Sequence, residues 1–144
     1  MVTIGLATES ERKCFYLDWI TERCCGAVRF EVDAPRDLLV YACNCSICSM
    51  TGFLHLIVPA ARFRLLTSPA ALSSYSFNTG VAKHLFCRTC GIKSFYVPRS
   101  HPDGYSVNVR CIDPGTIERV ELELFDDNDR RAAEARFRDR SQPD

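Results

Sequence analysis

The sequence predicts a mainly β fold in a single domain, with one short helix near the C-terminus. Three observations support this prediction. The chain has 144 residues, which suits one compact domain better than two. Between residues 27 and 124, short apolar or alternating runs follow one another and are separated by turn-forming residues. Only Asp129–Arg140 is rich in Ala, Glu and Arg and free of Gly and Pro, as a helix requires.

Nine runs have the length and composition of β-strands. Ala27–Val32 alternates apolar and polar residues, Leu38–Ala42 is apolar, and Leu54–Val58 is apolar apart from one histidine. The others, in chain order, are Phe63–Leu66, Ser74–Asn78, Ala82–Phe86, Ser94–Val97, Ser106–Ile112 and Ile117–Leu124. Asp127 and Asn128 suit the N-cap of the helix that follows. Residues 1–22 lack clean periodicity, so we treat them as an N-terminal extension, 23–125 as the main domain, and 126–144 as the C-terminal helix and tail.

Composition and charge exclude several classes of protein. The hydrophobic fraction of 47% and the charged fraction of 25% are those of globular chains, so a disordered or low-complexity protein is excluded. Eighteen basic residues balance eighteen acidic ones, and bulk charge therefore attracts neither nucleic acid nor an anionic membrane. Charged residues precede any apolar run, and no run reaches the roughly 18 residues of a membrane span. We expect a cytoplasmic protein; its oligomeric state cannot be predicted.

Nine cysteines indicate metal chemistry, because clustered thiols in a reducing compartment seldom form structural disulfides. Cys43, Cys45 and Cys48 form a C-x-C-x-x-C run after an apolar strand. A C-x-x-C turn can offer two thiolates to one zinc ion, and the cysteine two residues earlier can add a third. The alternatives are an iron–sulfur cluster and three buried thiols that only pack.

A second pair, Cys87 and Cys90, precedes Gly91 in another C-x-x-C motif. A thioredoxin-like dithiol would stand between a strand and a helix, whereas predicted strands flank this pair on both sides, so we favour a metal site. The missing ligands must come from elsewhere in the chain, and the obvious donors lie in Cys24-Cys25-Gly26. The sequence therefore predicts two metal sites.

These motifs resemble one known family. The segments Cys25–Phe30, Cys43–Cys48 and Phe86–Gly91 are similar to those of the glutathione-dependent formaldehyde-activating family, also called the centromere protein V family. The similarity covers roughly residues 22–115, and segments such as Ser94–Ser100 resemble the centromere protein V branch in particular. It implies that residues 23–125 form a small twisted β fold with two zinc sites. That fold is shared with methionine-R-sulfoxide reductases and with a Rab-binding exchange chaperone, so fold alone would leave the function open.

The resemblance also assigns the two zinc ions. It places a structural zinc on Cys25, Cys87 and Cys90, and a catalytic zinc on Cys43, Cys45 and Cys48. The family motif usually begins C-x-C-G, whereas this chain has Arg23-Cys24-Cys25-Gly26, so the first ligand position holds an arginine. Adjacent residues on a straight strand point to opposite faces, so Cys24 joins Cys25 on one metal only if the backbone kinks. The fourth ligand is therefore Cys24, Cys14, another group or water.

Two functions follow from these assignments. In the first, the resemblance implies a carbon–sulfur lyase: zinc on Cys43, Cys45 and Cys48 binds glutathione or another small thiol as thiolate, which adds to a small aldehyde. Formaldehyde would give S-hydroxymethylglutathione. In the second, both zinc ions only stabilise a β-domain that binds a protein partner. A methionine-sulfoxide reductase would need a free redox cysteine, for which Cys111 is the nearest candidate.

Four further residues have weaker signals. His55 could orient a substrate, but a strand histidine is more often satisfied by a neighbour. His84 lies three residues before Cys87, so on a strand the two side chains face opposite ways. Arg99 and Arg110 could bind a glutathione carboxylate, although exposed arginines are the default reading of both.

Overall fold

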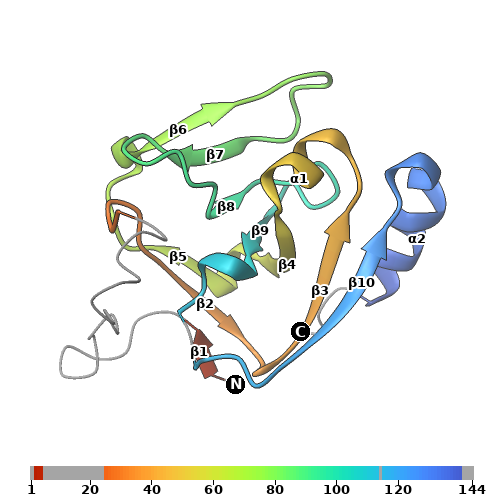
Figure 1. The fold of residues 1–144 in the computed structure, drawn as a ribbon, viewed down its shortest axis with the longest axis horizontal. Coiled ribbons are helices and arrows are strands. Elements are labelled where there is room, and N and C mark those ends of the chain that lie inside the picture. Colours follow the sequence, from red (N-terminus) through yellow and green to blue (C-terminus); the bar gives the residue numbers. More distant parts are fainter. Residues whose placement is uncertain (1, 5–24, 114, 141–144) are drawn as a thin grey trace.

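The computed structural model describes residues 2–4, 25–113 and 115–140, and it is mainly β (Figure 1). The strands are β1 (Val2–Ile4), β2 (Phe30–Ala34), β3 (Asp37–Cys43), β4 (Leu54–Pro59), β5 (Phe63–Leu65), β6 (Leu72–Tyr75), β7 (His84–Cys87), β8 (Phe95–Tyr96), β9 (Gly104–Asn108) and β10 (Arg119–Phe125). The α-helices are α1 (Ser46–Thr51) and α2 (Arg130–Arg140). Short 3-10 turns are η1 (Ala60–Arg62), η2 (Pro69–Ala71), η3 (Val109–Cys111) and η4 (Asp127–Asp129). The predicted mainly β class with a C-terminal helix is confirmed.

Two predicted strands need correction, and one helix is added. The strand predicted to start at Ala27 starts at Phe30, because Gly26 has a φ of +77° and turns the chain before it extends. The strand predicted to reach Ile112 ends at Asn108, whose side chain accepts a hydrogen bond from the Arg110 amide and caps η3. Helix α1 was not predicted; it ends at Gly52 in the left-handed conformation.

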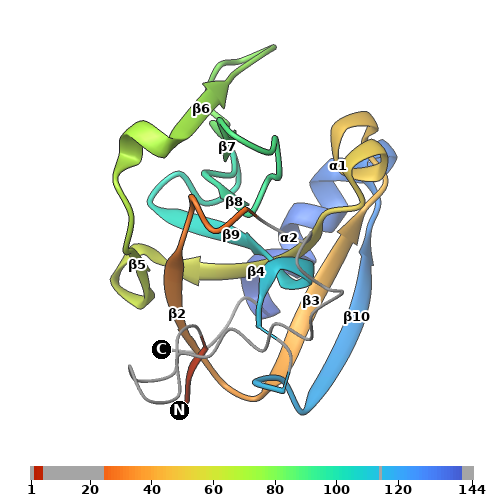
Figure 2. The same cartoon turned by 60° about the vertical axis from the view of Figure 1, so that its left-hand side comes forward.

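A five-stranded sheet in the order β10-β3-β4-β9-β8 forms the centre of the fold (Figures 1 and 2). Strands β1, β2 and β5 form a second sheet, and β6 pairs with β7 in a hairpin. Strand β10 runs parallel to β3 along the full length of both, from Arg119 opposite Asp37 to Phe125 opposite Cys43. The last strand therefore ends beside the first cysteine motif.

The pleat of the central sheet gives it two different faces, one apolar and one that carries most of its polar side chains. One face belongs to the main core, to which β3, β4, β8 and β9 contribute Leu38, Val40, Leu56, Val58, Phe95 and Val107. Residues paired across neighbouring strands share a face, and those that alternate with the core residues point the other way. That second face carries Tyr41, Cys43, His55, Ile57, Tyr96, Ser106 and Asn108. It forms the floor of the candidate site described below.

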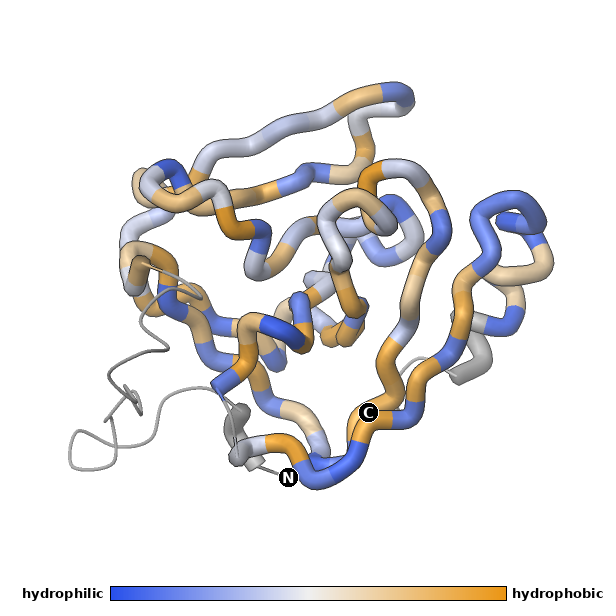
Figure 3. The backbone as a smooth tube through the Cα atoms, in the orientation of Figure 1, coloured by the Kyte–Doolittle hydropathy of each residue, from blue (hydrophilic) through white to orange (hydrophobic). Residues whose placement is uncertain are grey.

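The edge strand β10 alternates hydrophobic and hydrophilic residues along its length (Figure 3). Val120, Leu122 and Leu124 are exposed, Leu124 by 81%. They lie opposite Leu38, Val40 and Ala42 of β3, so they extend the core face of the sheet beyond the core itself. In the part of the chain that the structure describes, no helix is long and apolar enough to cross a bilayer.

Strands β9 and β4 approach each other closely at Gly104. A Cβ atom at this position would lie 2.7 Å from the backbone carbonyl oxygen of Val58, which cannot move without disturbing the central sheet. We expect Gly104→Ala to lower the free energy of unfolding by about 1–3 kcal/mol, measured by urea denaturation followed by circular dichroism. Gly80→Asn is the control, because Gly80 stands in open space and asparagine tolerates its positive φ. Equal urea midpoints for Gly104→Ala and the control would contradict the close approach.

Candidate metal centres and the adjoining cavity

The first cysteine motif gathers three thiols at the junction of β3 and α1. Cys43 is the last residue of β3, Cys45 is the N-cap of α1, and Cys48 lies within the helix. Their sulfur atoms lie within 4.8 Å of one another, so they can hold one metal ion. We call this group the buried trio, because Cys48 is buried and the other two are partly buried.

Hydrogen bonds within the buried trio favour negative charge on sulfur. The Cys45 amide lies 3.4 Å from the Cys43 sulfur, and the Cys48 amide bonds to the Cys45 sulfur. A hydrogen bond from the Cys48 thiol lowers the pKa of Cys43 to about 6, and the same bond, with burial, raises the pKa of Cys48. Burial raises the pKa of Cys45. These hydrogen bonds favour the thiolate form of Cys43 over the thiolate forms of Cys45 and Cys48.

Asn44 fixes the buried trio to the C-terminal part of the chain. Its side-chain amide donates to the Asp126 carboxylate at 2.7 Å, and its carbonyl oxygen accepts from the Asp127 amide at 2.7 Å. Its own backbone amide bonds to the carbonyl of Phe125 at 3.3 Å. The asparagine between the first two cysteines thus joins the metal loop to the segment that connects β10 with α2.

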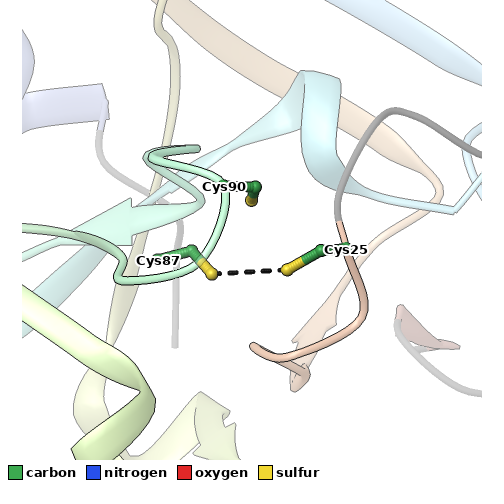
Figure 4. Close-up of side chains that lie close together, drawn as sticks. All are labelled: Cys25, Cys87 and Cys90. Carbon is green, nitrogen blue, oxygen red and sulfur yellow. Dashed lines mark hydrogen bonds between the residues drawn. The ribbon is translucent and has the colours of Figure 1, made fainter.

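The second trio, which we call the surface trio, consists of Cys25, Cys87 and Cys90. Its three sulfurs also lie within 4.8 Å of one another, and Cys25 and Cys90 are exposed. Figure 4 shows Cys25 facing the knuckle formed by Cys87 and Cys90, with 3.5 Å between the sulfurs of Cys25 and Cys87. Gly26 and Gly91 follow the trio with φ of +77° and +75°, which turns the chain beside each motif.

Backbone amides also point at the sulfurs of the surface trio. The Thr89 amide lies 3.4 Å from the Cys87 sulfur, and the Ala27 amide bonds to Cys25. Burial is the largest single effect on Cys90 and raises its pKa, but the backbone and thiol hydrogen bonds together outweigh it and lower the pKa to about 7. Cys24 and Cys14, the two candidates for a fourth ligand, lie outside the described residues. The described part of the chain supplies three ligands to this site.

A cavity of about 150 Å³ adjoins the buried trio. Its floor is the face of the central sheet that carries Tyr41, His55, Ile57 and Tyr96, and residues of α1, α2 and the β6–β7 connection complete its lining. The apolar part of its lining is Tyr41, Ile47, Ile57, Phe77, Ala82, Tyr96, Pro98 and Phe125. All three sulfur-bearing residues of the trio line it, so a molecule in the cavity lies next to the thiols.

His55 forms part of the cavity wall and is 5% exposed. Its Nδ1 lies 2.9 Å from the Ser106 hydroxyl and 3.5 Å from the Tyr96 hydroxyl. Its Nε2 is buried and has no hydrogen-bond partner among the described residues. Burial, with the charge of Lys93, lowers the pKa of His55 to about 3, so the imidazole is neutral. The sequence-based expectation of a satisfied strand histidine holds for one ring nitrogen and fails for the other.

Lys93 lies behind two residues of the cavity lining, His84 and Tyr96. Its ammonium is 2.8 Å from His84 Nδ1 and 4.0 Å from the centre of the Tyr96 ring. Burial lowers the pKa of Lys93 to about 8, while the charges of Cys48 and Cys45 act in the opposite direction. Lys93 remains mostly protonated at neutral pH and is an internal cation beside the thiols.

Aromatic rings lead from the surface to the cavity floor. Tyr75 stacks on Phe77, Phe77 on His84, and His84 on Tyr96, with centroid distances of 5.7, 5.4 and 5.1 Å. His84 lines the cavity and does not belong to the surface trio, as its position three residues before Cys87 predicted. Burial, then the charge of Lys93, lowers the pKa of His84 to about 4.

The other predicted candidates divide between the cavity and the surface. Arg99 lines the cavity and bonds Glu134 of α2 at 3.2 Å, whereas Arg110 donates to the Gly52 carbonyl at 3.0 Å and is not part of the lining. Cys111 is partly buried on η3 and belongs to neither trio.

Several residues in or beside the cavity had no sequence signal of their own. Tyr96 and Glu134 line the cavity, and Asn44, Lys93 and Ser106 contact residues that line it. All five are polar residues of ordinary type in segments whose neighbours are fixed only by the fold. The alternation of β4 and β9 was the usable signal, because it places His55 and Ser106 on the face opposite the apolar residues.

Comparisons with known proteins agree with this arrangement. The family model of the glutathione-dependent formaldehyde-activating enzyme matches residues 19–128. A crystal structure of a Rhodobacter sphaeroides protein is similar, with 34% sequence identity and a TM-score of 0.56, over 69% of this chain and 94% of that one. Both cysteine trios and all the cavity-lining residues except Arg130 and Glu134 lie within the matched residues, and the chain therefore belongs to the glutathione-dependent formaldehyde-activating family.

Proposed function

We propose that the protein is a zinc-dependent carbon–sulfur lyase that acts on glutathione, or another small thiol, and a small aldehyde such as formaldehyde. The observation that carries this proposal is the position of the buried trio, whose three cysteines line a cavity. Three protein ligands with access to a cavity are typical of catalytic zinc, whereas structural zinc usually has four. Membership of the family supplies the substrate class.

The donor sets fit zinc. Thiolate sulfurs bind zinc at about 2.3 Å in tetrahedral geometry, which separates two sulfurs by roughly 3.8 Å. The 3.5 Å between Cys25 and Cys87 is close to this value and far from the roughly 2.05 Å of a disulfide. Backbone amides bond to sulfurs in both trios, as they do around metal-bound thiolates.

Residues of the chain are suited to bind and neutralise a thiol substrate. A bound zinc ion would lower the pKa of a thiol beside it. Three cysteine thiolates and Zn²⁺ carry one net negative charge, which the Lys93 ammonium offsets from the side of Cys45 and Cys48. Arg99 and Arg130 line the cavity together with Glu134, so both signs of charge are available to the carboxylates and the amino group of glutathione.

A second candidate function is a zinc-stabilised module that binds a protein partner. It is favoured by the exposed apolar row of Val120, Leu122 and Leu124 on β10, an edge strand whose outer side has no partner strand among the described residues. The two functions make different demands on the buried trio. Catalysis requires access for a small thiol, whereas the module requires only that the metal stays bound.

We expect two zinc ions per chain in protein purified without a chelator, as measured by elemental analysis. Cys45→Ala is expected to retain one zinc and remain folded, because it leaves the surface trio intact. Cys87→Ser is expected to lose the other zinc and to unfold at a clearly lower urea concentration, because the surface trio joins β7 to the segment before β2. Iron in place of zinc, or no metal at all, would contradict the proposal.

The fourth ligand of the surface trio remains a prediction that we assign to Cys24. Arginine cannot coordinate zinc, and a zinc ion held by only three thiolates near the surface would exchange readily. Cys24→Ser is therefore expected to release zinc to a chelator about ten-fold faster than the wild type, and Cys14→Ser at the wild-type rate. Equal rates for Cys24→Ser and the wild type would show that the ligand is another group.

Glutathione is expected to bind with its thiol at the buried trio, and Cys45→Ala to abolish binding, because the metal–thiolate contact is the strongest anchor available to a flexible tripeptide. The measurement is titration calorimetry. S-methylglutathione is the control, since it keeps the charges of the tripeptide but cannot become a thiolate. If it binds as tightly as glutathione, or if neither binds at millimolar concentration, the module is favoured over the lyase.

A further inference from the structure

The unpartnered Nε2 of His55 indicates a ligand that the described residues do not provide. A buried polar nitrogen without a hydrogen bond costs roughly 1–3 kcal/mol, and folded proteins seldom leave one unsatisfied. His55 lines the same cavity as Cys43, Cys45 and Cys48, and it projects from the polar face of the sheet, as Cys43 does. The absent partner is therefore expected within the cavity.

The proton positions around His55 follow from its neighbours. The Ser106 and Tyr96 hydroxyls are both buried, and each has one proton to donate. The two hydroxyls bond to each other and both approach His55 Nδ1. If one hydroxyl donates its proton to the other, the second hydroxyl still needs an acceptor for its own proton. Among these three side chains that acceptor is Nδ1 of His55. When Nδ1 accepts, the proton of the neutral imidazole is on Nε2.

A metal ligand is a poor role for this nitrogen. His55 does not join the group of ligand atoms that lie within 4.8 Å of one another at the buried trio. A ring nitrogen that carries a proton also has no lone pair to offer a metal. A protonated Nε2 can still donate one hydrogen bond. The His55 ring packs against the rings of Phe53 and Tyr96, which keep bulk water away.

We propose that His55 is a catalytic residue whose Nε2–H donates a hydrogen bond to the oxygen of the aldehyde substrate; this assignment rests on the proposed lyase function. The thiolate sulfur of glutathione forms a bond to the aldehyde carbon, and the π pair of the C=O bond moves to oxygen. The Nε2–H bond stabilises that developing negative charge, as an oxyanion hole does. The oxygen then takes a proton from solvent water. This balances the proton that the thiol gave to solvent when it became a thiolate. Cleavage follows the same steps in reverse.

The neutral state of His55 suits this role. An imidazolium would be acidic enough to transfer its proton, but it would also place a second positive charge beside Lys93 in a buried site. A neutral imidazole that donates from Nε2 polarises a carbonyl without changing its own charge. The serine and tyrosine hydroxyls behind it fix the tautomer and the orientation of the ring.

The test compares three zinc-loaded variants with the wild type. His55→Leu removes the donor, His55→Gln keeps an N–H group that can occupy the place of Nε2, and His101→Gln changes an exposed histidine outside the cavity lining. Glutathione binding is measured by calorimetry, and the exchange between glutathione with formaldehyde and S-hydroxymethylglutathione by NMR. We expect unchanged glutathione binding in all three. The protein-dependent exchange rate should fall about 100-fold in His55→Leu, recover partly in His55→Gln and stay at the wild-type value in His101→Gln.

A second readout does not depend on activity. Nitrogen-15 NMR of the wild type should show His55 protonated on Nε2, with a signal that moves when glutathione and formaldehyde are added together and not with glutathione alone. A proton on Nδ1, or wild-type exchange in His55→Leu, overturns the assignment of His55 while glutathione binding leaves the lyase standing. A wild type that binds no glutathione overturns the lyase and the assignment together.

Discussion

The pleat of the central sheet is the constraint on which the site depends. Successive residues of a strand must point to opposite faces, and in this sheet one face is closed by the main core. The other face is consequently free to carry groups that a core would not accept, including a histidine, a serine and a cysteine. A shift of one residue in β4 or β9 would exchange the two sets and bury polar groups in the core, so the core fixes the register of the cavity floor.

The C-terminal ends of β3 and β10 meet at the buried trio, because β10 runs parallel to β3. Parallel strands need a long connection, and here that connection contains most of the fold, including β4 to β9. Asn44 then bonds to Asp126 and Asp127, which brings α2 with Glu134 to the cavity. The helix that looked peripheral in the sequence is therefore part of the wall of the site.

Local sequence features predicted the parts of the site that depend on local geometry. The spacing of Cys43, Cys45 and Cys48 alone brings three thiols together, because a strand end and one helical turn suffice. The surface trio joins residues that are distant in the sequence. The spacing of Cys87 and Cys90 predicted a metal site with its missing ligands in Cys24-Cys25-Gly26, and the family resemblance singled out Cys25. Helix α1 escaped prediction because six residues are too few to show a 3.6-residue period. The contact of His55 with Ser106 could not be predicted, because it depends on the pairing of strands about fifty residues apart.

Lys93 links the electrostatics of the trio to those of the cavity. Thiolates at the buried trio stabilise its positive charge, and its burial near the rings of Tyr96 and Phe53 limits screening by water. Burial is the main cause that lowers the pKa of His55 and His84, and the charge of Lys93 lowers it further. Both histidines are therefore neutral. A neutral His55 carries one ring proton. Because the Ser106 and Tyr96 hydroxyls approach Nδ1, we place this proton on Nε2, where it can donate to the proposed substrate.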